Sequence, residues 1–200
     1  MTRSMLLAAM ALALTSASSV AWGQAFDRQP GETDLAFATR ALKLGEDAAP
    51  HALTADWNGV PTLFVDYETA GGDPDRAERP LVAIRPQPAG GYRAVQVTLG
   101  EQEGGTPDIK AIGFARATHN PSKDLIVILA WPQMHYDVEG TLYEVRIFAS
   151  PEPGQTVLTP LRVSDKFGSG CDCSWRDGSS KRYRFKTIAA VQAELRRLGY

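Results

Sequence analysis

The two cysteines of the chain, Cys171 and Cys173, stand one residue apart in the sequence GSGCDCSW and are its most distinctive chemical feature. Residues i and i+2 of an extended strand point to the same side, so the two sulfur atoms can meet. In a fully extended strand their Cα atoms lie about 6.5–7 Å apart, near the upper limit for a disulfide. A bridge therefore needs a local bend, which the preceding Gly-Ser-Gly permits.

Three chemistries are open to this pair. In an oxidising compartment the cysteines would form a small structural disulfide. As free thiols they would be a redox-active dithiol, although the carboxylate of Asp172 between them would raise their pKa. As thiolates they would bind Cu or Zn, with Met134 and His135 as further ligands from the segment after an apolar run. Outside this metal possibility, we predict no cofactor.

Two pairs of acidic residues offer a different chemistry, because two carboxylates are what a glycosidase needs. The pairs are Glu101 with Glu103 and Asp137 with Glu139. Spacing along the chain does not fix their separation in space, so a hydrolase that acts on cell-wall material stays one alternative. The common nucleophile-elbow, phosphate-loop, zinc-protease and dinucleotide motifs are absent from the sequence. We therefore favour a protein that is not an enzyme.

Aromatic residues beside predicted turns are candidates for a binding surface. Trp131 ends an apolar run, Tyr136 follows it closely, and Trp175 follows the cysteine pair. Aromatic side chains at such positions combine a large apolar area with a polar group, which suits recognition of a glycan or a protein.

The first 25 residues predict export. Arg3 is followed by the apolar run MLLAAMALAL and then by small and polar residues, which is the order of a secretory signal peptide. An apolar run of about ten residues is too short to span a bilayer as a helix. Small residues permit cleavage after Ala25 or after Gly23. The expected mature protein is a single domain over residues 26–200, without a transmembrane segment, in the periplasm or outside the cell.

The hydrophobic pattern of the mature chain predicts an α+β fold. Apolar residues at helical spacing predict helices over 34–44 and 187–198, with Thr33 or Asp34 and Thr187 as N-caps. Between them the period changes to two, and turn residues separate short β-favouring segments. We predict a single antiparallel sheet of about seven or eight strands, with both helices packed on one face, and a half-closed barrel as the alternative. The candidate strands are 52–57, 62–68, 81–86, 92–99, 109–116, 124–131, 141–149 and 157–163.

Within the second helix, the sequence AAVQAELRRLGY resembles the first helix of peptidoglycan-binding domains over about twelve residues. That family closes its core with further helices. We interpret the stretch here as an amphipathic helix that docks on the sheet.

Composition excludes several classes of protein. The chain has 200 residues, 44% of them hydrophobic and 22% charged, which excludes a wholly disordered chain. A formal net charge of -2 argues against a nucleic-acid binder, which needs a basic surface. The sequence thus favours an exported binding protein whose partner is an envelope protein or a glycan. A thiol or soft-metal protein and a hydrolase are the alternatives.

Overall fold

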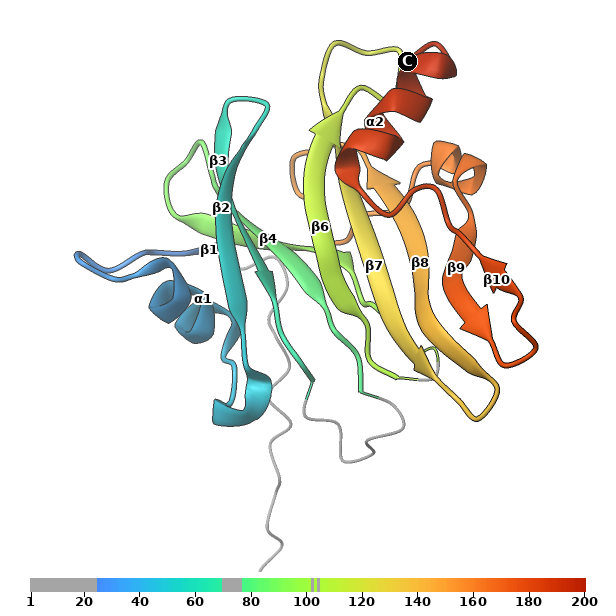
Figure 1. Cartoon of the computed structure of the whole chain (residues 1–200). Coiled ribbons are helices and arrows are strands. Elements are labelled where there is room, and N and C mark those ends of the chain that lie inside the picture. The colour runs from blue at the N-terminus through green and yellow to red at the C-terminus, as the bar shows by residue number, and fades with distance from the viewer. Residues whose placement is uncertain (1–24, 70–76, 102, 104) are drawn as a thin grey trace, which may run out of the picture.

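The computed structural model describes residues 25–69, 77–101, 103 and 105–200. The predicted signal peptide lies outside these residues except for Ala25. These residues form two α-helices and two five-stranded antiparallel sheets (Figure 1). The prediction of a single sheet of seven or eight strands was therefore wrong, whereas the antiparallel, mostly β character is confirmed.

Sheet A is the N-terminal sheet, with the strand order β1-β5-β4-β3-β2. Its four longer strands follow one another as a meander, and β1 adds to the free edge of β5. Its strands are β1 (Ala25–Phe26), β2 (His51–Trp57), β3 (Val60–Asp66), β4 (Leu81–Pro86) and β5 (Tyr92–Thr98).

Sheet B is the C-terminal sheet, with the order β10-β9-β8-β7-β6, so that consecutive strands pair throughout. Its central strands β7 and β8 have eleven residues each, longer than the predicted segments. Its strands are β6 (Asp108–Ala115), β7 (Asp124–Met134), β8 (Val138–Phe148), β9 (Ser169–Trp175) and β10 (Ser180–Lys181).

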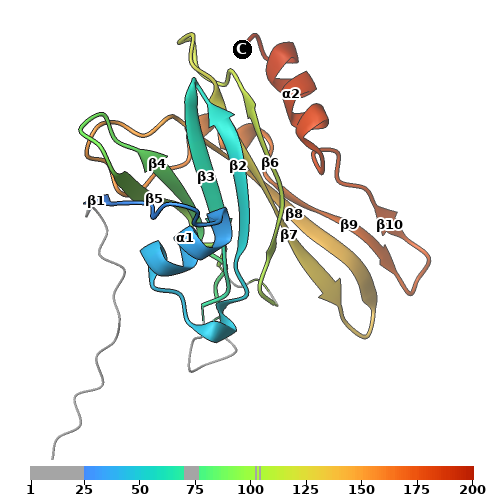
Figure 2. The same ribbon diagram turned by 90° about the vertical axis from the view of Figure 1, so that its left-hand side faces the viewer.

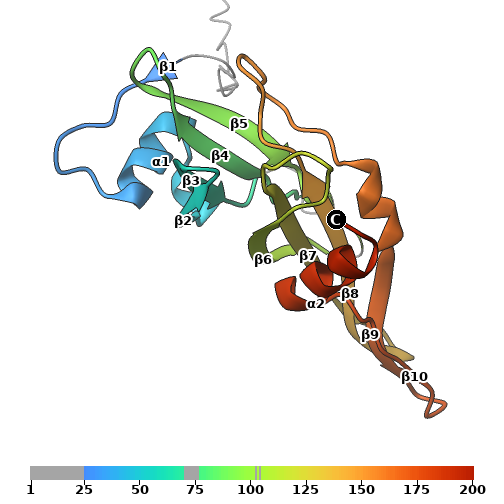
Figure 3. The same cartoon turned by 90° about the horizontal axis from the view of Figure 1, so that it is seen from above.

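The two helices cover different sheets rather than one shared face. Helix α1 (Asp34–Leu42) packs on sheet A through Phe37 and Leu42, and α2 (Ile188–Arg197) packs on sheet B through Val191 and Leu195. Figures 2 and 3 show each helix beside its own sheet. Both predicted threonine caps are present, because Thr33 accepts a hydrogen bond from the N–H of Ala36 and Thr187 from that of Ala190.

The main core lies between the sheets. Alternation along β7 sends Leu125, Val127 and Leu129 toward sheet A and Ile126 and Ile128 toward α2. This explains why the β7 sequence is apolar on both faces. The core between the sheets contains Trp57, Phe64, Leu81, Ala83, Val95, Val97, Leu125, Val127, Leu129, Trp131, Phe148 and Leu158.

Two sets of hydrogen bonds join the sheets at their margins. The indole N–H of Trp57 donates to the carbonyl oxygen of Lys123 (2.9 Å), and the N–H of Lys123 donates to Asn58 Oδ1 (2.8 Å). The N–H of Gln96 in β5 donates to the carbonyl oxygen of Thr156, in the segment that follows β8.

This segment was predicted as a strand over 157–163, but only Val157 forms an isolated bridge, and the chain then enters a 3₁₀ helix, η3 (Arg162–Lys166).

No helix in the described ranges is long and apolar enough to cross a membrane.

Candidate functional site

The cysteine pair lies on β9, with the sulfur atoms of Cys171 and Cys173 in contact and their Cα atoms 5.3 Å apart. This separation is shorter than that of a fully extended strand, so β9 contracts locally, as the sequence required. Cys173 is 1% exposed and Cys171 is half-buried. Solvent or a reactant therefore reaches the pair mainly through Cys171.

A glycine on the neighbouring strand makes room for the pair. Gly140 of β8 lies directly opposite Cys173. A Cβ atom on Gly140 would lie 2.6 Å from the Cα and 2.7 Å from the Sγ of Cys173, and would also meet the carbonyl oxygen of Asp172. Side chains essentially never approach so closely, so glycine at position 140 allows β8 and β9 to come together at this point.

Asp172 does not face the two sulfur atoms. Strand alternation turns its carboxylate to the opposite side of β9, where it pairs with Lys186 and with Arg182 (2.8 Å for Arg182). These hydrogen bonds, from Lys186 first and then from Arg182, hold the pKa of Asp172 below its usual value. The expected repulsion between this carboxylate and a thiolate is therefore weakened by the two cations.

The predicted additional metal ligands do not approach the cysteines. Met134 ends β7 and is 84% exposed, and His135 lies exposed in the following turn. Strand β8 separates β7 from β9, and alternation sends Met134 to the face of sheet B opposite to that of the cysteines. Across the described ranges no three His, Cys, Asp or Glu side chains gather as a metal site would require. The geometry thus leaves a Cu or Zn site without its third and fourth ligands.

The acidic pairs do not form a catalytic dyad in this structure. Glu101 pairs with Arg146 (2.9 Å), which also binds Glu144. Burial raises the pKa of Glu101, but hydrogen bonds from its backbone and from Arg146 outweigh this effect and lower it overall. A carboxylate held ionised by arginine is poorly suited to donate a proton. Glu103 and Asp137 lie exposed outside the strands, and Glu139 lies exposed near the start of β8.

The predicted aromatic binding residues are separated by the fold. Trp131 lies in the core between the sheets, 1% exposed, and its indole N–H donates to the carbonyl oxygen of Glu101 (2.9 Å). It is therefore not at the surface. Sequence analysis placed it at the end of a strand, whereas β7 continues to Met134 and carries Trp131 in its interior.

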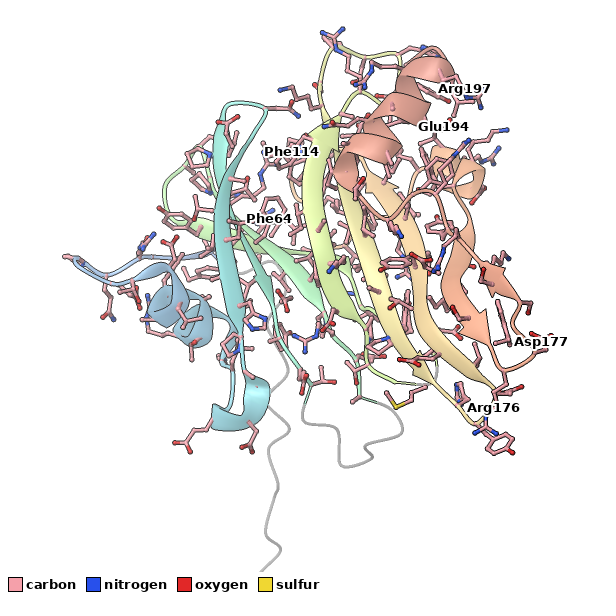
Figure 4. All side chains as sticks on the ribbon, in the orientation of Figure 1. Phe64, Phe114, Arg176, Asp177, Glu194 and Arg197 are labelled. Atoms are coloured by element: carbon pink, nitrogen blue, oxygen red, sulfur yellow. A yellow bond between two sulfur atoms is a disulfide. The ribbon has the colours of Figure 1, made fainter. Side chains whose placement is uncertain are left out.

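The other two aromatic residues lie at the same end of sheet B. Trp175 of β9 lies opposite Val138, at the start of β8. Tyr136 is 82% exposed in the β7–β8 turn, and the guanidinium of Arg176 lies 3.8 Å from the centre of its ring. Figure 4 places Arg176 and Asp177 at the opposite end of the sheet from Glu194 and Arg197 of α2. We name Met134, Tyr136, Trp175 and Arg176 the tip surface.

Sequence analysis missed a second feature, a cavity of about 240 Å³ at the margin of the core. Arg85 and Arg93 line it from adjacent strands, and the segment 151–155 closes one side. The sequence does contain a feature that predicts the pairing of these two arginines. The hairpin between the predicted strands 81–86 and 92–99 contains Gly90 and Gly91, and pairing across it places the two arginines opposite each other.

Comparison with protein-family models, with curated proteins and with solved structures finds no match for the chain.

Proposed function

We propose that the protein is exported and acts as a non-catalytic binding protein of the bacterial envelope, with the tip surface as its contact site. The observation that carries the proposal is the exposure of Met134 (84%) and Tyr136 (82%) at the end of the longest hairpin. Methionine, aromatic residues and arginine are the residue types enriched in protein interfaces. All four stand at one end of sheet B, on its turns or at the strand ends beside them, which favours a protein or a glycan as the partner.

The non-catalytic role draws support from the acidic residues. Glu101, the best placed of the four predicted acids, is engaged by Arg146, and the other three are solvated. Such exposed carboxylates lack the shielded environment in which general acids and bases act.

A photo-crosslinking amino acid at position 136 tests the contact site in cells. We expect cross-linked products from position 136 and none from position 165, where Asp165 is exposed on η3 but remote from the tip surface. For a glycan partner, we expect the purified protein to sediment with isolated cell-wall sacculi, and Tyr136→Ser to abolish this sedimentation. Equal cross-linking at both positions, together with unchanged sedimentation of Tyr136→Ser, would contradict the proposal.

One intact-mass spectrum tests both export and the oxidation state of the cysteines. We propose that Cys171 and Cys173 form a structural disulfide, which suits an oxidising compartment and the contact between their sulfur atoms. The intact mass of protein taken from the periplasm should show cleavage after Gly23 or Ala25 and a mass lower by two hydrogens. An alkylating reagent should add nothing to the denatured, unreduced protein.

The same spectrum can contradict this assignment. Two alkylations without prior reduction would show free thiols and favour the thiol alternative. A metal-sized increment under native conditions, lost in a Cys171→Ser, Cys173→Ser variant, would favour the soft-metal alternative. Retention of residues 1–23 would contradict cleavage of the signal peptide.

A further inference from the structure

Two arginines point into the space between the sheets at the margin of the core. Arg85 of β4 and Arg93 of β5 are direct partners across the strand pair. They alternate with Ala83 and Val95, which lie in the core between the sheets, so all four side chains share the inner face of sheet A. Beyond this point the segment 151–155 covers sheet A, and the cavity of about 240 Å³ lies between them.

Neither arginine has a counter-charge among the residues the structure describes. Arg85 Nε and Arg93 Nε are buried and make no hydrogen bond there. Like charges placed directly opposite each other in a sheet are destabilising, and buried polar atoms without partners are rare in native proteins. Both side chains are half-buried, and their two buried Nε donors are left for another group to satisfy.

The described residues around the pair provide an aromatic contact for Arg85 but no ion pair for either arginine. Arg85 lies over the ring of buried Trp57, with its Cζ 5.1 Å from the ring centre, and burial lowers its pKa. The one acidic residue in the lining, Glu152, is exposed at the rim and forms no ion pair with either arginine. Its backbone N–H donates to Gln155 Oε1, which fixes the local turn instead.

We propose that this cavity binds a small organic oxyanion, a carboxylate or a phosphate carried on an apolar body. Two guanidinium groups on neighbouring strands can each donate forked hydrogen bonds to the oxygen atoms of such a group. Apolar side chains, together with Gln87, Glu152 and Gln155, line the remainder of the site. Its volume is below the range of about 300–1,000 Å³ typical of drug-sized ligands. These apolar lining residues are Val60, Pro86, Pro88, Val95, Pro151 and Pro153. The site is separate from the tip surface, and the proposal does not depend on the function proposed for the tip surface.

Calorimetric titration of the full chain with three related probes tests the proposal. Benzoate supplies a carboxylate, phenyl phosphate a phosphate, and benzyl alcohol a neutral body of similar shape. We expect saturable one-to-one binding of benzoate or phenyl phosphate, with benzyl alcohol weaker by about tenfold or more. The tighter of the two anions identifies the chemical source of the oxyanion.

Arginine variants connect that binding to the cavity. Arg85→Met and Arg93→Met keep the apolar stem and should each weaken binding of the preferred anion by about tenfold or more. Arg162→Met removes an exposed arginine from η3 and should leave the affinity unchanged. Equal affinity for benzyl alcohol, no anion binding, or full affinity in the Arg85→Met, Arg93→Met double variant would each overturn the proposal.

A stability measurement separates a binding role from a structural one. Without added anion, Arg93→Met should raise the melting temperature by about 1–3 °C, because it removes a like-charge pair and a buried N–H without a partner. A structural role predicts a lower melting temperature with unchanged anion affinity, and that result would also overturn the proposal.

Discussion

Replacement of Trp131 by alanine is expected to lower the free energy of unfolding by about 3–5 kcal/mol, the range for truncation of a fully buried tryptophan. Trp131 is 1% exposed and belongs to the core that joins the two sheets. Its indole N–H also donates a hydrogen bond to the carbonyl oxygen of Glu101, in the connection between β5 and β6. The variant therefore creates a cavity and releases the segment through which the chain passes from sheet A to sheet B. Urea denaturation monitored by circular dichroism gives the difference directly.

Two control variants separate packing from binding. Trp131→Phe keeps most of the ring volume but loses the indole N–H, so an intermediate loss of about 1–3 kcal/mol is expected. Tyr136→Ala removes an exposed ring and should change the free energy of unfolding by less than about 0.5 kcal/mol. If Trp131→Ala were as stable as the unchanged protein, the placement of Trp131 in the core would be wrong.

The helix starts and most of the strands could be predicted from the sequence because each depends on a few neighbouring residues. Thr33 and Thr187 mark both helix starts through the hydrogen bonds they can accept. Alternating apolar residues marked seven of the ten strands. Of the three missed strands, β1 and β10 have two residues each. The third, β9, consists mostly of Gly, Ser, Cys and Asp, which carry little β preference, and it forms because β8 offers it an edge.

The division into two sheets could not be read in the same way. Strand alternation identifies which residues face a core, but it does not state whether another sheet or a helix supplies that core. Strands β5 and β6 follow each other in the chain, yet they belong to different sheets, with Gly100 and Pro107 packed closely in the connection between them. Such a choice depends on packing between residues remote in sequence, as in the contact of Trp57 with Phe114.

The candidate sites show the same division between local and long-range information. The meeting of Cys171 with Cys173 depends on one strand and was foreseen. The proposed approach of Met134 and His135 required a strand register and failed because β8 lies between them and the cysteines. The opposed arginines of the cavity depend on a short hairpin, and the pairing of β4 with β5 would have placed them together.

Gly140→Ala is the second substitution with a large expected effect, a loss of about 3 kcal/mol at the upper end of the range for overpacking. The added methyl group would meet the carbonyl oxygen of Asp172 and the Cα of Cys173, which are backbone atoms and cannot rotate away. β8 and β9 would have to separate where they carry the cysteine pair, with loss of ladder hydrogen bonds. Urea denaturation measures the loss, and hydrogen exchange should show faster exchange at residues 169–175 than elsewhere in sheet B.

Two controls test this prediction: an alanine substitution at another glycine, and a double-mutant cycle with the cysteines. Gly45→Ala adds a methyl group with no atom within 4 Å and should cost only a few tenths of a kcal/mol at this N-cap position. In a background where Cys171 and Cys173 are both alanine, the clash with Cys173 Sγ disappears but the backbone clashes remain. The loss of stability caused by Gly140→Ala should therefore be smaller in that background but should not disappear. Complete relief would mean that the sulfur atom alone requires glycine at position 140, and that the strands can otherwise part without cost.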